Sequence, residues 1–378
     1  MPQRAAPTRA ITPRRCGRLP STRRCTRWCT KPGSAHRGCG YRWSPLTMPR
    51  ATGQQAQPGT AEIDRLVSGA HHNPHAILGA HPVTGGGVVV RALQPLAETV
   101  TVVIPGGQRF AAGHVHAGVF EASLPLEVVP DYRLVVTYPA PPGGSAPPVV
   151  TDDPYRFLPS LGEMDLYLIG EGRHEELWRA LGAHVRRYGP PEEAAAAAGP
   201  GGNGRPGEVE FGVVTGTSFA VWAPNARGVR VIGDFNHWDG TGYPMRSLGG
   251  SGVWELFVPG IGDGTRYKYD ILAPDGQWRR KADPLAALAE HPPATASVVY
   301  SSGYEWQDAG WLEARRSVEH VREPVSIYEV HLGSWRPGRS YRQLADELTG
   351  YVTRMGFTHV EFMPVAEHPF AGSWGYQV

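Results

Sequence analysis

The sequence predicts a multidomain chain in which two β-sandwiches are followed by the beginning of a parallel α/β fold. Two sets of short β-rich runs, separated by Pro- and Gly-rich loops, are typical of small antiparallel sandwiches. A strand–helix–strand pattern near the C-terminus is typical of a parallel unit that is buried on both faces. With 378 residues the chain is long enough for two or three domains with sizeable cores.

The first fifty residues differ in composition from the rest of the chain. They hold twelve Lys or Arg, no Asp or Glu, and all four cysteines. Because they lack a periodic apolar pattern, we expect residues 1–59 to be a disordered basic tail and the functional protein to start near Met48. A zinc site formed by the cysteines with His36 is an alternative, but their spacing matches no common zinc module. Nucleic-acid binding by the tail would rest on charge alone.

The rest of the chain carries 25 basic and 35 acidic side chains and no cysteine. A protein body without cysteine fits a reducing cytosol. No apolar segment follows the N-terminal charges as in a secretory signal, and no apolar run is long enough to span a bilayer. We therefore expect a cytoplasmic protein with no membrane or nucleic-acid partner, no metal and no cofactor.

The predicted N-terminal sandwich covers residues 60–158. The stretch "AEIDRLVS" (61–68) favours a short helix ahead of "GAHHNPHAILGAHP". Four β-rich runs follow, at Val88–Arg91, Thr99–Ile104, Val119–Leu124 and Tyr132–Tyr138. The Pro-rich segment 139–150 then forms a stiff polar loop.

A linker is expected over residues 159–205. Its first part, "EELWRALGAHVRRYG" (175–189), favours a helix, and the Ala/Gly/Pro-rich segment 190–208 favours a mobile connection. The second predicted sandwich covers residues 206–302 and closes its own core. Its β-rich runs are Phe219–Trp222, Val229–Ile232, Val253–Val258 and Tyr267–Ile271, and Trp222 and Trp254 are expected in the core.

The C-terminal segment, residues 303–378, begins a parallel unit. "PVSIYEVHLGSW" (324–335) holds a strand that ends in a Gly-rich loop, and Ser340 with Gln343 forms a capping box. The apolar stripe of the following helix comprises Leu344, Leu348, Tyr351, Val352 and Met355. Gly356 ends the helix, and "HVEFMPV" (359–365) is the second strand.

Two strands and one helix would leave much of this unit's apolar surface uncovered. The residues expected to face water are Val325, Ile327, Val330, Val360, Phe362 and Met363. We therefore expect residues 303–378 to be disordered or prone to association in isolation.

Several collinear segments resemble the bacterial 1,4-α-glucan (glycogen) branching enzymes of the α-amylase superfamily. They include "NPHAILGAH", "FAVWAPNARGVRVIGDFNHWDG", "SGVWELFVPGI", "KADP", "YEVHLGSW", "MGFTHVEFMPVAEHPF" and "GSWGYQ". The resemblance runs from about residue 60 to the C-terminus and implies two immunoglobulin-like sandwiches, a (β/α)₈ barrel and a C-terminal β domain. Only the first strands and helix of such a barrel are expected before residue 378.

The resemblance also implies a chemistry. Family members cleave α-1,4 links and form α-1,6 branches by retaining double displacement with two carboxylates. Those carboxylates lie on later barrel strands, so we expect no catalytic residue among these 378 and no activity from them alone. The implied partner is an α-glucan such as glycogen or amylose, and the full-length form is expected to be a monomer. A debranching or trehalose-releasing amylase relative, or a non-catalytic α-glucan-binding protein, remains an alternative.

The resemblance places Tyr376 in the loop after the second barrel strand, against the sugar on the donor side of the scissile bond. The alternative is an ordinary loop aromatic that packs on barrel neighbours. Trp374 is equally compatible with a binding and a structural role. Glu361, Glu367 and His368 resemble an acid/base set but are expected to orient the loop or to pair with later charges.

The second sandwich resembles the glycogen-binding module that also occurs in the β subunit of AMP-activated kinase. Trp238, Lys268 and Trp278 fall at the positions where two tryptophans and a lysine hold the polysaccharide in that module. Indole faces stack on glucose rings and an ammonium donates to hydroxyls. The alternative is that Trp238 packs beneath its loop and that the module only braces the barrel.

His71, His72 and His75 resemble a cluster of metal ligands. No Cys or acidic residue stands at a companion spacing, and the resemblance implies that this stretch is a structural turn.

Overall fold

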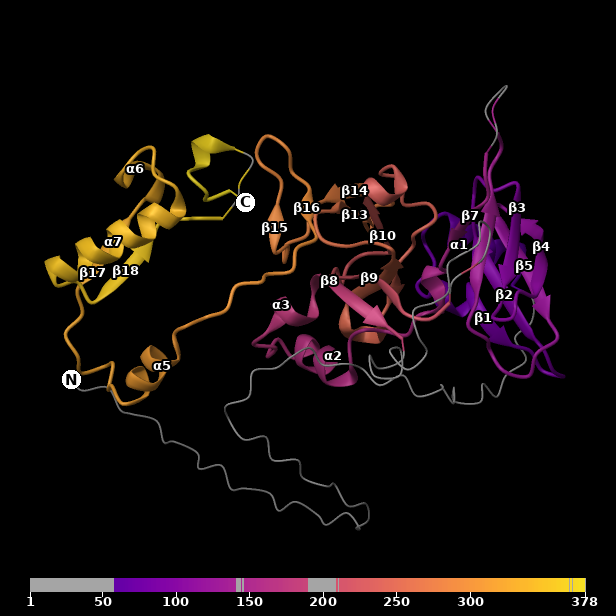
Figure 1. Cartoon of the computed structure of the whole chain (residues 1–378), viewed down its shortest axis with the longest axis horizontal. Helices are drawn as coiled ribbons and strands as arrows, with labels where there is room; N and C mark the ends of the chain where they lie inside the picture. The colour runs from indigo at the N-terminus through magenta and orange to yellow at the C-terminus, as the bar shows by residue number, and fades with distance from the viewer. Residues whose placement is uncertain are drawn as a thin grey trace, which may run out of the picture. The chain divides into compact units, whose positions relative to one another are not determined.

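The computed structural model describes residues 58–140, 144, 146–189, 209, 211–366, 368 and 370–377 (Figure 1). The expectations for the basic tail up to residue 57, its cysteines included, lie outside the described residues, as do those for segment 190–208 and for Glu367. No helix within these ranges is long and apolar enough to cross a membrane.

The first β-rich unit begins with helix α1 (Thr60–Val67), whose Ile63 and Leu66 are buried. Seven strands follow, hydrogen-bonded in the order β1-β2-β5-β4-β3-β6-β7. Their bounds are Gly79–Pro82 for β1, Val88–Leu93 for β2, Thr99–Val103 for β3, Arg109–His116 for β4, Val119–Leu124 for β5, Arg133–Thr137 for β6 and Val149–Thr151 for β7. The predicted helix is confirmed, and the four predicted strands are confirmed as β2, β3, β5 and β6.

Strand β4 joins the two layers of this unit. It pairs with β3 along one part of its length and with β5 along the other, and its register shifts between His114 and His116. Such a bulge bends a strand and increases its twist. Alternate residues of β2, β3, β5 and β6 therefore meet in one buried cluster, as the period-2 pattern predicts.

The segment between the two sandwiches contains a strand where a helix was predicted. After the short helices η2 (Pro154–Arg156), α2 (Glu163–Gly170) and α3 (Leu177–Ala180), the chain forms β8 (Gly182–Tyr188). The predicted helix over 175–189 is thus wrong beyond Ala180. Gly182 has a φ of 98°, which a helix does not accommodate, and β8 pairs with β9 over its whole length. The pairing partner outweighs the helix-forming tendency of the local sequence.

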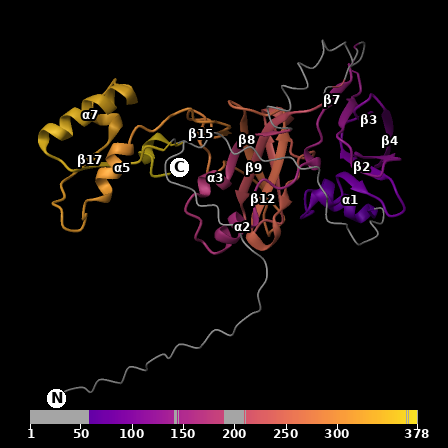
Figure 2. The same ribbon diagram turned by 60° about the horizontal axis from the view of Figure 1, so that its bottom comes forward.

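The second sandwich consists of two sheets. One has the order β11-β12-β9-β8, and the other has the order β10-β13-β16-β15, with β14 also paired to β13. Figure 2 shows β8, β9 and β12 side by side. The bounds are Val214–Trp222 for β9, Gly228–Gly233 for β10, Arg246–Ser247 for β11, Val253–Pro259 for β12, Arg266–Leu272 for β13, Trp278–Lys281 for β14, Leu288–Ala289 for β15 and Ser297–Val298 for β16. The four predicted strands are confirmed as β9, β10, β12 and β13.

The second sandwich does not close its core alone, which corrects the expectation of independent cores. Ile63 and Leu66 of α1, with Leu78 after the helical turn η1 (Pro74–Ala76), belong to the same buried cluster as Val229 and Phe219. The two backbones also touch. The carbonyl group of Gly69 lies so close to Gly228 that a Cβ atom at Gly228 would collide with it. The sequence gives no local signal for this contact, since each element is amphipathic in its own right.

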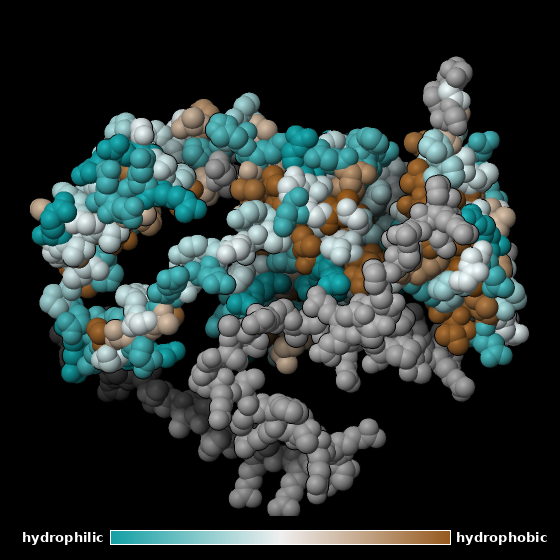
Figure 3. Space-filling model, in the orientation of Figure 1, coloured by the Kyte–Doolittle hydropathy of each residue, from teal (hydrophilic) through white to brown (hydrophobic). Residues whose placement is uncertain are grey.

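The C-terminal segment forms the predicted strand–helix–strand unit. Helix α5 (Ala309–Arg316) precedes β17 (Ile327–Val330), the short helix α6 (Leu332–Trp335), α7 (Tyr341–Met355) and β18 (His359–Phe362). The two strands pair in parallel, and a last helical turn, η5 (Ala371–Ser373), follows. The visible face of this unit in Figure 3 is mainly hydrophilic.

The ends of α7 carry the predicted signals. The Ser340 hydroxyl accepts from the Gln343 backbone N–H, and the Gln343 side chain accepts from the Ser340 backbone N–H. Gly356 ends the helix in the left-handed region, with a φ of 79°.

Three residues of this unit differ from expectation, and one of them is Met363, which was expected to face water but is half-buried. Met355 lies on the apolar stripe but is 60% exposed. The fifteen residues of α7 extend about 22 Å, whereas a four-residue strand extends about 13 Å, so the strands do not reach the last turn. Val330 was expected to face water but is buried, because it packs against Leu348 and Val352 of α7.

Candidate functional site: an aromatic face and a loop pocket

The strand pairing of the second sandwich places Lys268 and Trp278 on one face of the β10–β13–β14 sheet. Lys268 pairs with Ile232, Asp270 pairs with both Arg230 and Arg280, and Leu272 pairs with Trp278. Directly paired residues point to the same side of a sheet. Tyr267 and Tyr269, which flank Lys268 on β13, point to the opposite side and are fully buried.

Trp278 lies at the start of β14 and is 37% exposed. The guanidinium carbon of Arg230 lies 4.4 Å from the centroid of its indole ring, a cation–π arrangement. Burial lowers the pKa of Arg230, while the carboxylates of Asp239 and Asp270 act in the opposite direction. The Arg230 cation thus covers one side of the indole, and part of the ring remains accessible to solvent.

Trp238 is held near this face by its backbone. It follows the helical turn η3 (Asp234–Asn236), and both His237 and Trp238 have left-handed backbone, with φ of 53° and 63°. This conformation is strained for an aromatic residue and persists only where neighbours fix it. The Trp238 N–H donates to Gly233 O at 3.0 Å, and Arg280 Nη2 donates to the Trp238 carbonyl at 3.3 Å. Its side chain is half-buried, neither hidden beneath the loop nor fully exposed.

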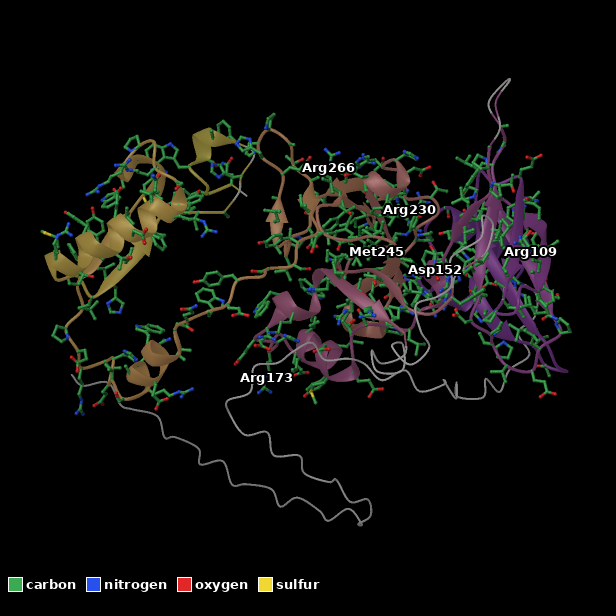
Figure 4. The ribbon with its side chains drawn as sticks, viewed as in Figure 1. Arg109, Asp152, Arg173, Arg230, Met245 and Arg266 are labelled. Carbon is green, nitrogen blue, oxygen red and sulfur yellow. The ribbon has the colours of Figure 1, made fainter. Side chains whose placement is uncertain are left out.

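The loop that carries Trp238 has an ionic anchor. Arg266 Nε and Nη2 donate to the two carboxylate oxygens of Asp234 at 2.9 and 3.0 Å, and Arg266 Nη1 donates to Glu290 at 3.2 Å (Figure 4). The Arg266 guanidinium is the largest cause that lowers the pKa of Asp234, and a hydrogen bond from the Trp238 side chain lowers it further.

Lys268 differs from the arginines of this face in its partners. Its ammonium donates to Thr295 Oγ1 at 2.6 Å, and it has no carboxylate partner among the residues that the structure describes. Arg230, Arg266 and Arg280 each have a carbonyl or carboxylate acceptor within the protein. Lys268 is therefore the cation with most capacity to donate to a ligand hydroxyl.

The structure places Lys268 and Trp278 on one face and the Trp238 backbone against Arg280 of that face, and it adds four residues that the sequence argument missed. These are Arg230, Asp234, Arg266 and Arg280. The alternation of β13 could have indicated the outward side chains, but the partner of each arginine depends on loops far away in the chain.

The two tryptophans expected in the core behave differently. Trp254 is buried and its indole N–H donates to Ala223 O at 3.1 Å, so this prediction is confirmed. Trp222 is 54% exposed, so that prediction is wrong. It is the last residue of β9, and its indole N–H donates to Ser251 O at 3.1 Å at the rim of the sheet.

A second candidate site lies in the loops that follow β17 and β18. Since parallel strands have their carboxyl ends at the same edge, the two loops meet there. They enclose a pocket of about 280 Å³. Its lining residues are His331, Leu332, Gly333, Tyr341, Pro364, Val365, Ala366, His368, Ala371 and Trp374.

Trp374 and Tyr376 differ in their relation to this pocket. Trp374 lines it, is 55% exposed and lies against His331, with 4.9 Å between the ring centroids. Tyr376 is 68% exposed and is not among the lining residues. The described lining contains apolar groups, two imidazoles and a phenol but no carboxylate, so it can hold a ligand and cannot by itself supply a carboxylate pair.

The acidic and histidine residues around these loops do not form an acid/base set within the described chain. Glu361 is exposed on β18 and pairs with Glu329 of β17. The His368 ring contacts its own loop through Nδ1, 3.0 Å from Ala366 O.

The three N-terminal histidines lie in separate surroundings. His71 Nε2 is 3.5 Å from Glu62, and His72 stacks on Trp254. Both ring nitrogens of His75 are buried without a hydrogen-bond partner, and burial is the largest cause that lowers its pKa well below the usual range. No group of three or more metal-ligating side chains occurs in the part of the chain that the structure describes.

Two protein families match parts of this chain. Residues 59–155 match the N-terminal domain of the alpha-1,4-glucan branching enzyme GlgB. Residues 208–286 match carbohydrate-binding module 48, the isoamylase N-terminal domain. A 1,4-alpha-glucan branching enzyme GlgB of Thermobifida fusca is 58% identical over 337 residues, which are 88% of this chain. The chain is a homologue of the N-terminal part of these branching enzymes.

Other branching enzymes agree with this assignment. The one from Frankia casuarinae is 59% identical over 319 residues, which are 84% of this chain. The chain spans 42% of the length of the Thermobifida relative and 36% of the Frankia relative. Trp238, Lys268 and Trp278 fall within the module 48 match, whereas Trp374 and Tyr376 lie outside both family matches.

Among solved structures, a putative alpha amylase from Salmonella typhimurium is 25% identical and covers 43% of this chain and 25% of its own, with a TM-score of 0.32. A pullulanase from Anoxybacillus complexed with maltotriose is 18% identical and covers 76% of this chain and 39% of its own, with a TM-score of 0.29. These scores are too low to bear on the arrangement of the branching-enzyme homologue.

Proposed function

We propose that this protein is a 1,4-alpha-glucan branching enzyme of glycogen biosynthesis, of which these 378 residues supply the N-terminal part. The observation that carries the proposal is the 58% identity to a branching enzyme over 337 residues. The reaction cleaves an α-1,4 link and transfers the chain to a 6-hydroxyl by retaining double displacement. The carboxylate nucleophile and acid/base are not among these residues, so they do not branch glucan by themselves.

The β17–α7–β18 unit is proposed to be the start of the (β/α)₈ catalytic barrel. The parallel register of β17 and β18, with a helix between them, supports this proposal. So does the pocket at the carboxyl ends of both strands, because barrel active sites form at that edge. Trp374 then provides one wall of the site, and Tyr376 turns toward the donor sugar once the remaining loops surround it.

The outer face of the β10–β13–β14 sheet is proposed to bind α-glucan. Trp278 and Trp238 stack on glucose rings, and the Lys268 ammonium donates to hydroxyls. The shared face, the exposed indole surface of Trp278 and the absence of a carboxylate partner for Lys268 in the described chain support this role.

A chimeric enzyme tests the branching activity. The residues matched to the Thermobifida fusca relative replace their counterparts in that enzyme, and iodine staining of amylose is followed. We expect the chimera to lower the iodine colour as the parent relative does, while the 378-residue chain alone behaves like a boiled control. A folded chimera without activity, or loss of amylose colour with the 378-residue chain alone, would contradict the proposal.

Affinity electrophoresis in glycogen-loaded gels tests the glucan-binding face. We expect the 378-residue chain to be retarded, and the Trp278→Ala and Trp238→Ala variants to migrate faster than the parent. Trp222→Ala is the matched control, because Trp222 is also exposed but lies at the end of β9 in the opposite sheet. Equal migration of all four proteins would remove stacking at Trp238 and Trp278 as the mechanism.

A further inference from the structure

The Arg230 side chain lies where three segments of the chain meet. Its Nη2 donates to the carbonyl of Val67 at 2.7 Å, and its guanidinium carbon lies 4.4 Å from the ring centroid of Trp278. Two glycines give it room. A Cβ atom at Gly69 would come within 2.5 Å of Arg230 Nε, and one at Gly240 within 2.7 Å of Arg230 Cβ. The guanidinium thus bridges the N-terminal unit and the proposed glucan-binding face.

The acceptor of this bridge is firmly placed. Val67 is the last residue of α1, and the carbonyl groups of a final helical turn lack partners within the helix. A cation is favourable at that end of a helix because the dipole is negative there. Ile63, one turn earlier, and Leu66, the preceding residue, are buried in the core shared with the second sandwich, and this burial anchors the end of the helix.

Trp278, in contrast, has little else to hold it. All four residues of β14 are exposed, and the strand pairs with β13 alone. An aromatic ring that must be ordered when a sugar binds reduces the affinity by the cost of that ordering. A ring that already rests on a fixed guanidinium has lost this freedom before the ligand arrives.

We propose that Arg230 is a positioning residue that fixes the indole of Trp278 for α-glucan binding, and that helix α1 of the N-terminal unit holds Arg230 in place. The N-terminal unit then contributes to glucan affinity without touching the glucan. This inference rests on the glucan-binding role proposed above for Trp278. Arg230 offers its face to the indole and its Nη2 N–H to the Val67 carbonyl, so its proposed role is to position Trp278 and not to bind the sugar itself.

The test is a double-mutant cycle on the 378-residue chain, with retardation in glycogen-loaded gels as the readout. Arg230→Met keeps an unbranched apolar side chain but loses the charge and the planar guanidinium, and it should weaken glycogen affinity about three- to tenfold. Arg230→Lys keeps a donor for the Val67 carbonyl but has no planar group to stack on the indole. Its glycogen affinity should lie between those of the parent and Arg230→Met. Arg279→Met lies on β14 next to Trp278, but its side chain pairs with exposed Asp275; this variant is the matched control and should migrate like the parent.

The cycle separates positioning from a general loss of structure. In the Trp278→Ala background, which retains Trp238, Arg230→Met should cause no further loss of affinity. An equal loss in both backgrounds would mean that Arg230 acts on the fold and would overturn the inference. Full affinity of Arg230→Met when Trp278→Ala weakens binding would overturn it as well. If Trp278→Ala leaves the glycogen affinity unchanged, or the parent is not retarded in the gel, the proposed glucan-binding face is wrong. The inference about Arg230 is then wrong as well.

Discussion

Asp153 is a carboxylic acid buried in the first sandwich, between a phenol and a backbone amide. Its Oδ2 accepts from Tyr132 Oη at 2.7 Å, and its Oδ1 accepts from the Tyr155 N–H at 2.9 Å. Desolvation is the largest influence and raises the pKa of Asp153 to about 6, although both hydrogen bonds favour the charged form. The site therefore prefers the protonated acid over much of the mildly acidic range.

This raised pKa predicts a pH dependence of stability. Between about pH 4 and pH 6 the unfolded chain has released the proton while the folded protein still holds it, so the free energy of unfolding falls as the pH rises. A shift of two pKa units corresponds to about 3 kcal/mol. In Asp153→Asn the amide oxygen can accept from the Tyr155 N–H and the amide nitrogen can donate to Tyr132 Oη, so the free energy of unfolding should change by about 3 kcal/mol less between pH 4 and pH 6 than in the parent.

Urea unfolding of the parent and the variant at pH 4.5, 5.5 and 7 measures this difference. Asp263→Asn, at an exposed turn of the second sandwich, is the control and should leave the slope unchanged. Parallel curves for the parent and Asp153→Asn would show that the Asp153 carboxyl is ionised in the folded protein throughout this range.

Glu255 is the most buried charged residue of the second sandwich. Its Oε2 accepts from Arg246 Nε at 3.2 Å and from Arg246 Nη2 at 3.1 Å, and its Oε1 accepts from the Ser160 N–H at 2.8 Å. Arg246 also donates to Phe157 O at 3.1 Å, so the pair ties segment 157–160 to β11 and β12. Removing one member of such a pair leaves an uncompensated buried charge.

We expect Glu255→Ala to lower the free energy of unfolding by about 3–5 kcal/mol, as for other broken buried pairs. The double variant Glu255→Leu with Arg246→Met should recover part of this loss, because no unpaired charge remains. Chemical denaturation followed by tryptophan fluorescence measures both. A single variant within about 1 kcal/mol of the parent would mean that water reaches the guanidinium.

At the scale of whole elements, the two sandwiches share one structural corner. In each, an Asp-Pro pair follows an edge strand: Asp153 follows β7, and Asp283 follows β14. Like Asp153, Asp283 accepts from a buried tyrosine, Tyr267 Oη at 2.7 Å, and from the N–H two residues on, Leu285 at 2.8 Å. The two units are thus built on a common plan.

The corner also shows where the two units diverge. The residue after the tyrosine is Lys268 in the second unit and Arg133 in the first. Arg133 is buried and paired with Asp131 and Asp152, whereas Lys268 is available for a ligand. At this position the first unit therefore holds its cation in ion pairs within the protein.

Some elements were predictable from the sequence, and others were not, for definable reasons. β3 and β13 alternate polar and apolar residues, so their faces are encoded locally, and β2 is a short apolar run. β14 carries four exposed residues, Trp-Arg-Arg-Lys, and has no apolar face to detect. The candidate aromatic face was found only through a family resemblance, and the role of Arg230 depends on a contact with α1 that no local pattern contains.

The strands β17 and β18 expose apolar residues that a complete sheet would cover. Val325, Ile327, Val360 and Phe362 are exposed. Unpaired strand edges with apolar faces are templates for association. We expect the 378-residue chain to form oligomers in light scattering, and Ile327→Lys to reduce them.

Val128→Lys adds the same charge to an exposed position of the first unit and should have no effect on association. Limited proteolysis followed by mass spectrometry adds a second readout, because cuts should cluster beyond about residue 310. A monomeric preparation that is protected to its C-terminus would show that these strands are covered in solution.

At the scale of the molecule, the shared core makes the two sandwiches depend on each other. Leu66 of α1 is fully buried together with residues of β9, β10 and β13. Leu134 of β6 lies in the separate core of the first unit. A truncation to alanine at either position lowers the free energy of unfolding by about 2–5 kcal/mol. The two variants should destabilise different parts of the protein.

Hydrogen exchange followed by mass spectrometry distinguishes the two variants. Leu66→Ala should accelerate exchange in β10 and β13 as well as in α1, because one cooperative unit contains them. Leu134→Ala, the matched control, should affect mainly the strands of the first unit. If Leu66→Ala leaves β10 and β13 protected at the parent level, the two units open independently.

A carbohydrate module excised as residues 208–286 would lack several contacts that it has in the whole chain. It would lose β8, which hydrogen-bonds along β9, and so gain a bare sheet edge. It would also lose the side chains of α1 that cover Val229, and the carbonyl that holds Arg230. We expect a graft of that segment onto another enzyme to be unstable and its Trp278 side chain to be less well fixed. A graft that keeps these contacts runs from Thr60 to Val298, and protein engineers who wish to move the proposed glucan-binding face between enzymes should carry all of it.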